Sequence, residues 1–105
     1  MQIQVNTDHN IEGRDALVAR VRSIVESALS RWVDDITRVE VHLSDESGDK
    51  GGQNDKRCMM EARLEGRQPT AVTCEAATLA QAVAGAADKL KSAIESTLER
   101  LHEHR

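Results

Sequence analysis

Aromatic residues are almost absent from this chain of 105 residues, which has no Phe, no Tyr and a single Trp. Its core must therefore be filled by Val, Leu, Ile, Ala and Met, whose individual contacts are smaller than those of aromatic rings. The same lack argues against a reader of single-stranded nucleic acid, because such proteins stack bases on aromatic side chains.

Long apolar runs are missing as well. No segment approaches the roughly 18 consecutive apolar residues that a membrane-spanning helix requires, and the opening MQIQVNTDHN lacks the cationic start and apolar stretch of a signal peptide. We therefore expect a cytoplasmic protein with no membrane partner, whose two cysteines, Cys58 and Cys74, stay reduced. The length predicts one domain over residues 1–105, with a modest core that needs neither a metal ion nor a disulfide bond.

The charge balance is mildly acidic, with 14 basic and 18 acidic residues and a formal net charge of -4. This balance opposes general nucleic-acid binding, which depends on cations that release the counterions of phosphates. A local basic face can nevertheless form on an acidic protein.

Hydrophobic periodicity predicts four strands and two helices in the order β-α-β-β-β-α. We expect strands over 2–6, 36–44, 56–66 and 70–77, and helices over 14–32 and 79–101. The first two strands flank a helix and should lie parallel through a right-handed crossover, while the remaining strands form an antiparallel meander. The predicted fold is an α+β two-layer sandwich, with both helices on one face of a four-stranded sheet. On the other, wet face we expect Arg38, His42, Arg57, Glu61 and Arg63.

Residues with reactive or metal-binding chemistry are scattered. Cys58 and Cys74 face each other if the hairpin turns about Gly66, which would permit a disulfide or a two-thiolate site, but buried packing is the favoured interpretation. His102 and His104 are two apart on a helix and point in different directions, and the loop 45–56 lacks the glycine and acid of an EF-hand. With no nucleophile elbow or phosphate-binding loop, we expect no enzyme, cofactor, metal or small-molecule substrate.

Basic side chains lie along the flanks of both predicted helices. Arg20 and Arg31 share one flank of the first helix and Arg22 lies on the other. Lys89 and Arg100 share one flank of the last helix, with Lys91 opposite. The plain alternative is a solvated face, because Lys and Arg commonly border an apolar stripe and helical charges of mixed sign are usually solvent-exposed.

Several segments resemble the ribosome hibernation promoting factor and ribosome-associated inhibitor family, over nearly the whole chain. They are the opening MQIQVNTDHNIEGRDAL, the strand VEVHLS, and the helix TLAQAVAGAADKLKSAI with its Asp-Lys-Leu at 88–90. The resemblance is to the short form, which lacks a C-terminal dimerisation domain. It implies a fold similar to a double-stranded-RNA-binding domain with an added first strand. It also implies a non-enzymatic factor that occupies the mRNA and tRNA channel of the small ribosomal subunit and silences idle ribosomes.

The resulting hypothesis is a stress-response protein that binds ribosomal RNA phosphates and so regulates translation. Its expected contacts are Arg20, Arg22, Arg31, Lys89, Lys91 and Arg100. The alternative is a diverged member that binds a protein partner through Met59 and the acidic outer arc of the last helix. That arc comprises Asp88, Glu95, Glu99 and Glu103. A third hypothesis is a thiol sensor that uses Cys58 and Cys74.

Overall fold

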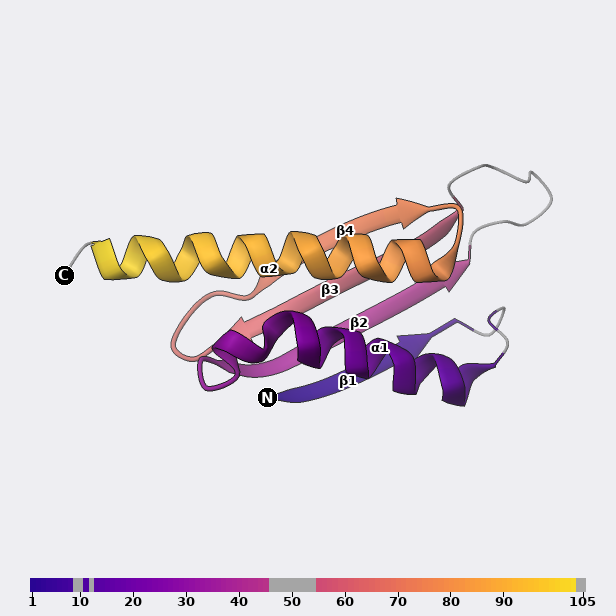
Figure 1. Cartoon of the computed structure of the whole chain (residues 1–105), viewed down its shortest axis with the longest axis horizontal. Coiled ribbons are helices and arrows are strands. Elements are labelled where there is room, and N and C mark those ends of the chain that lie inside the picture. The colour runs from indigo at the N-terminus through magenta and orange to yellow at the C-terminus, as the bar shows by residue number, and fades with distance from the viewer. Residues whose placement is uncertain (9–10, 12, 46–54, 104–105) are drawn as a thin grey trace.

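The computed structural model describes residues 1–8, 11, 13–45 and 55–103, without the side chains of 101–103. Its elements are strands β1 (Gln2–Thr7), β2 (Ile36–Asp45), β3 (Lys56–Leu64) and β4 (Thr70–Ala76), helices α1 (Arg14–Leu29) and α2 (Leu79–Glu103), and the 3-10 helix η1 (Ser30–Trp32). The predicted element order is confirmed (Figure 1). Three features interpreted from the sequence lie outside the described residues: positions 46–54 of the loop, His104, and the side chain of His102.

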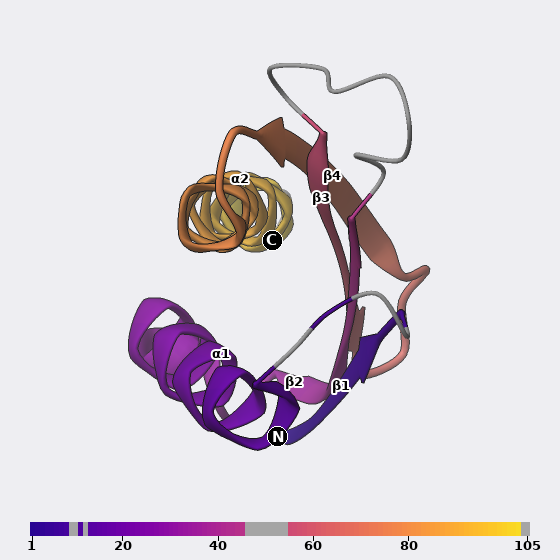
Figure 2. The same cartoon turned by 90° about the vertical axis from the view of Figure 1, so that its right-hand side faces the viewer.

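The four strands form one mixed sheet in the order β1-β2-β3-β4. β1 pairs with β2 in parallel, and β2, β3 and β4 form an antiparallel meander, as predicted. Both helices cover the same face of this sheet: α2 packs on β3 and β4, and α1 lies beside β1 (Figure 2). The two helices run in the same direction along the sheet (Figure 1). The α+β two-layer sandwich expected from periodicity is therefore confirmed.

Alternation along the strands separates the core from the open face, because successive strand side chains point to opposite sides. Inward residues of β2 and β3, such as Val41 and Met60, are fully buried, whereas His42 and Arg63 are exposed. The helices complete the core with mostly small aliphatic side chains. The buried helical residues are Val21, Val25, Leu29, Ala82, Val83, Ala86, Ala87, Leu90 and Ile94.

The end of the first helix differs from its prediction. The expected α-helix over 14–32 stops at Leu29, and the chain continues as the 3-10 helix η1. Leu29, the last residue of this α-helix, is only 1% exposed. The tighter 3-10 winding changes the direction of the following residues, and Trp32 still enters the core at 7% exposure.

None of the helices within the described ranges has the length and apolar character that crossing a membrane requires.

Three contacts set the position of α2: a cap at its first turn and two contacts with the edge strand β4. Thr78 caps the helix, since its hydroxyl oxygen accepts a hydrogen bond from the Gln81 amide at 3.1 Å. Farther along, the Lys89 ammonium donates to the Thr73 carbonyl at 2.8 Å. Between them Gly85 faces Cys74 so closely that a Cβ atom on Gly85 would lie 2.5 Å from the cysteine sulfur. The helix can approach β4 this closely only because Gly85 has no side chain.

We predict that Gly85→Ala lowers the free energy of unfolding by about 1 kcal/mol or more, because the added methyl group overpacks the contact with Cys74. In a Cys74→Ala background the same substitution should raise stability by roughly 0.5–1 kcal/mol, since Ala is the better helix former once the sulfur is gone. Chemical denaturation of the four proteins of this cycle measures both effects. Equal effects of Gly85→Ala in the two backgrounds would contradict the contact.

Candidate nucleic-acid interface

The ion pairs of the described residues all lie on the strands or at their ends. On the open face of the sheet the Arg38 guanidinium is 2.5 Å from Glu40, and that of Arg63 is 3.8 Å from Glu61. At one sheet end, Lys56 contacts Asp45 at 3.0 Å and Asp55 at 3.1 Å. The hydrogen bonds that the Lys56 ammonium donates to Asp45 and, secondarily, to Asp55 raise its pKa. Positive charge on the sheet is thus largely committed to neighbouring carboxylates.

The cations of the helix layer differ from those of the sheet. All six predicted contacts are exposed to solvent: Arg20, Arg22, Arg31, Lys89, Lys91 and Arg100. Within the described part of the chain, none of them forms an ion pair with a carboxylate. Their charges can therefore meet an external anion without first breaking an internal salt bridge.

A groove of about 390 Å³ lies between α1 and α2 on the solvent side. Small side chains line it: Ser23, Ile24, Ser27 and Ala28 from α1, with Ala84, Ala87 and Asp88 from α2. Arg20 stands one turn before Ile24, and Lys91 one turn after Ala87, so helical spacing places both cations along this groove. The low walls leave room for an anionic backbone to approach both side chains.

Arg31 lies at the end of α1, in a more acidic setting. Its guanidinium carbon is 5.7 Å from the centre of the Trp32 ring, within the range of a cation–π contact. It also borders a hollow of about 240 Å³, which is lined as well by carboxylates of α2 and of the segment between η1 and β2. The other lining residues are Trp32, Asp35, Glu95, Leu98 and Glu99. The positive charge of Arg31 is therefore partly offset by three nearby acids.

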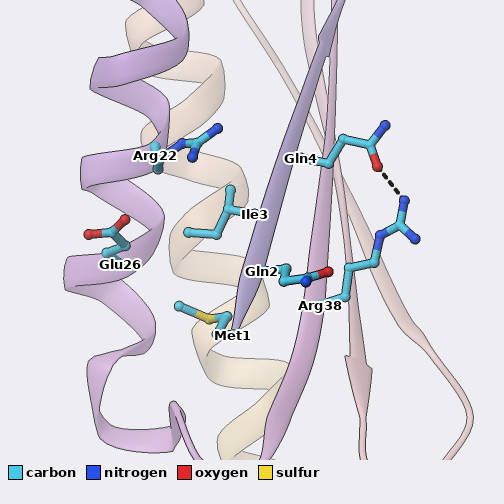
Figure 3. A pocket seen from close by; sticks show the side chains of 7 residues that line it. All are labelled: Met1, Gln2, Ile3, Gln4, Arg22, Glu26 and Arg38. Atoms are coloured by element: carbon cyan, nitrogen blue, oxygen red, sulfur yellow. Dashed lines mark hydrogen bonds between the residues drawn. The ribbon is translucent and has the colours of Figure 1, made fainter.

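Lys89 lies on the opposite flank of α2, where its ammonium donates to the Thr73 carbonyl of β4, and helical spacing places Arg100 farther along the same flank. The Arg100 guanidinium donates to the Ser96 carbonyl at 3.4 Å, within its own helix. Arg22 is separate again: it lies on the far flank of α1 and borders a hollow beside β1 (Figure 3). The structure therefore divides the six cations into three sets. Arg20, Arg31 and Lys91 lie along the side where α1 meets α2, Lys89 and Arg100 share the other flank of α2, and Arg22 is alone.

The helical wheels anticipated which cations share a flank, but not which flanks become neighbours. The flank of Arg20 and Arg31 meets the side of α2 that carries Lys91, whereas Lys89 turns away to β4 with Arg100 on the same flank. Sequence reasoning also missed the groove hydroxyls of Ser23 and Ser27. The sequence does show that the two serines are one helical turn apart beside Arg20. This spacing predicts a groove only when α2 is known to pack alongside α1.

The two cysteines are directly opposed across β3 and β4, as the turn about Gly66 predicted, and both are free thiols. Burial, and secondarily the neighbouring Cys74, raises the pKa of the Cys58 thiol to about 12. A thiol that stays protonated is a poor nucleophile and a poor metal ligand, which disfavours the sensor hypothesis. Among the described residues, no three His, Cys, Asp or Glu side chains gather as a metal site requires.

The open face of the sheet offers a different kind of surface. Met59 is half-buried there and borders a hollow of about 330 Å³ together with His42, Ser44 and Arg57. The strands carry no aromatic residue, so this face has no platform on which bases could stack. Recognition of RNA on this side would lack the contact that most sheet-based readers use.

A four-stranded mixed sheet covered on one face by two helices places the chain among α+β proteins. The chain belongs to the sigma 54 modulation protein / S30EA ribosomal protein family, whose model matches residues 3–102, and the family predicted from the sequence motifs is thereby confirmed. Among solved structures it is similar to the N-terminal domain of Protein Y from Thermus thermophilus, with 26% identity and a TM-score of 0.73 over 92% of this chain and 99% of that one.

A ribosomal subunit interface protein from Coxiella burnetii shares the fold, with 18% identity and a TM-score of 0.71 over 94% of this chain and 99% of that one. A search of curated proteins finds no significant match.

We predict that the Cys58 thiol makes stability fall at alkaline pH. The pKa of Cys58 is raised from 9.0 to about 12 in the folded protein, so above pH 9.0 the unfolded chain releases this proton while the folded protein retains it. The free energy of unfolding should then decrease by up to about 1.4 kcal/mol per pH unit between these values. Below pH 9.0 both states hold the proton and the contribution is fully present.

Denaturation of the wild type and of Cys58→Ala across this pH range measures the effect. The variant should be less stable at neutral pH because it loses buried side-chain volume, and its deficit should shrink above pH 9.0. Cys74→Ala serves as the control and should keep the alkaline decline. A deficit of Cys58→Ala that does not change with pH would contradict the assignment.

Proposed function

We propose that residues 1–105 act as one domain of a non-enzymatic, ribosome-associated factor in the cytoplasm. In this proposal the protein binds the small ribosomal subunit and, by occupying its surface, silences or protects idle ribosomes. Binding depends on contacts between helix cations and ribosomal RNA phosphates, without chemistry on the RNA and without a cofactor.

The observation that carries this proposal is the match of residues 3–102 to the S30EA ribosomal protein family. The likeness to Protein Y covers nearly all of both chains, so the shared architecture is complete rather than partial. The Coxiella protein with the same fold is itself named for the ribosomal subunit interface. These relationships favour a ribosomal partner over an unrelated nucleic acid.

Charge availability indicates which side faces the RNA. Arg38 and Arg63 on the sheet would have to leave Glu40 and Glu61 before they could bind phosphate. The helix cations face no such cost, so the helix layer is the better phosphate-binding side. The groove between α1 and α2, with Arg20 and Lys91, is the proposed centre of the contact, and Arg31, Lys89 and Arg100 are proposed at its margins.

A second candidate function is supported by the carboxylates of the same helix layer. Asp88 lines the groove beside the cations, and Glu95 and Glu99 border Arg31. Acids so placed repel phosphate and would suit a protein partner that carries basic residues. The two candidates differ in whether ribosomal subunits alone are sufficient for binding.

We predict that the purified protein co-sediments with purified small ribosomal subunits at low salt and is released at high salt. Arg20→Gln combined with Lys91→Gln should weaken binding and reduce the slope of log affinity against log salt by about one unit for each lost phosphate contact. The measurement is sucrose-gradient sedimentation at a series of salt concentrations. Large subunits in a parallel gradient test whether the small subunit is preferred.

Arg63→Gln combined with Arg67→Gln is the matched control, because it removes the same charge from the sheet side of the molecule. This control should sediment like the wild type. Lys89→Gln combined with Arg100→Gln reports whether the β4 flank takes part. If the wild type stays at the top of low-salt gradients with either subunit, ribosome binding is excluded and the protein-partner function is favoured.

A further inference from the structure

The edge strand β1 lacks the sequence features that usually keep an edge strand from pairing with another strand. Within the described residues it pairs only with β2, so its outer edge has no strand partner. From Met1 to Thr7 the sequence contains no charged residue and no proline. Edge strands present unpaired N–H and C=O groups, and natural proteins normally protect them with charge, proline or a covering element. β1 has none of the sequence-encoded protections.

The opposite edge of the sheet shows those protections. Pro69 directly precedes β4, and Glu75 lies within the strand. The Lys89 ammonium donates a hydrogen bond to the Thr73 carbonyl, which is then less available to a partner strand. The β4 edge of the sheet is therefore protected against pairing, whereas the β1 edge is not. This difference indicates that the β1 edge is available for a partner strand.

A hollow of about 540 Å³ lies around the edge of β1 (Figure 3). Met1 and Ile3 project to the helix side of the strand, and Gln2 and Gln4 to the open face, where Gln4 accepts a hydrogen bond from Arg38. An added strand would thus find apolar contacts on one side and amide groups on the other, the alternation that strand addition requires.

The wall of this hollow on α1 carries one charge of each sign. Arg22 and Glu26 stand one helical turn apart on the flank that faces the β1 edge, and both are exposed. Within the described residues neither forms an ion pair. A cation followed by an anion along one helix is complementary to the same pair running in the opposite direction. A two-fold axis between two copies produces this antiparallel arrangement, so the cation of each copy can meet the anion of the other.

We propose that β1 pairs antiparallel with β1 of a second copy of this chain, joining two sheets into one. In this arrangement Arg22 of each copy faces Glu26 of the other, and the uncharged strands meet without repulsion. A basic or an acidic peptide would satisfy only one of the two charges, so the second copy fits the edge better than an unrelated segment. The inference is independent of ribosome binding and assigns Arg22 to self-association.

We predict that sedimentation-equilibrium ultracentrifugation of the full chain shows a reversible monomer–dimer equilibrium. Arg22→Glu should raise the dissociation constant at least about tenfold, because two like-charge contacts form at the symmetric interface. Glu26→Arg should act equally. The double swap Arg22→Glu with Glu26→Arg should restore dimerisation, and an equimolar mixture of the two single variants should form a heterodimer.

Arg67→Glu, a charge reversal in the exposed turn between β3 and β4, is the control and should dimerise like the wild type. Circular dichroism confirms that each variant is folded, and recovery in the mixture excludes misfolding of either single variant. A wild-type chain that is monomeric at every concentration would falsify the proposal. So would a dimer that the single reversals leave intact, because it would then form through another surface.

Discussion

The close approach of α2 to β4 is the constraint on which the rest of the structure depends. Without Phe or Tyr, the layer between sheet and helices must be filled by short aliphatic side chains, so the helices have to lie near the strands. Ala82 and Ala86 are fully buried at this contact, and Gly85 meets Cys74 where no side chain fits. This contact also fixes the rotation of α2 about its axis, and therefore the direction of every charged residue on it.

The rotational setting of α2 explains the distribution of charge. It directs Lys89 to the backbone of β4 and leaves Lys91 beside α1. The strands meanwhile pair their charges among themselves, as Arg38 does with Glu40. A protein with net negative charge can in this way concentrate cations without ion pairs on its helix layer. The helix layer and the open sheet face are thus chemically different surfaces, although both carry charges of both signs.

The sequence allowed the sheet to be predicted in detail, because a period of two and a turn at Gly66 determine the pairing of β3 with β4. The opposition of Cys58 and Cys74 follows from that register alone. The helical stripes were less informative at their ends. The 3-10 turn after Leu29 depends on how the chain passes from the helix layer to β2 in the sheet, which periodicity does not encode. Which cations lie close together was harder still to predict, because the packing of α2 beside α1 decides which flanks of the two helices become neighbours.

The shared direction of α1 and α2 has an electrical consequence. Peptide dipoles align along each helix, giving partial positive charge at the amino end and partial negative charge at the carboxyl end. Because the two helices run the same way, these partial charges add instead of cancelling (Figure 1). Asp35, Glu95 and Glu99 strengthen the negative pole near the carboxyl end of α1. In the field of a polyanion these aligned helix dipoles favour orientations in which the amino ends of both helices face the negative charge.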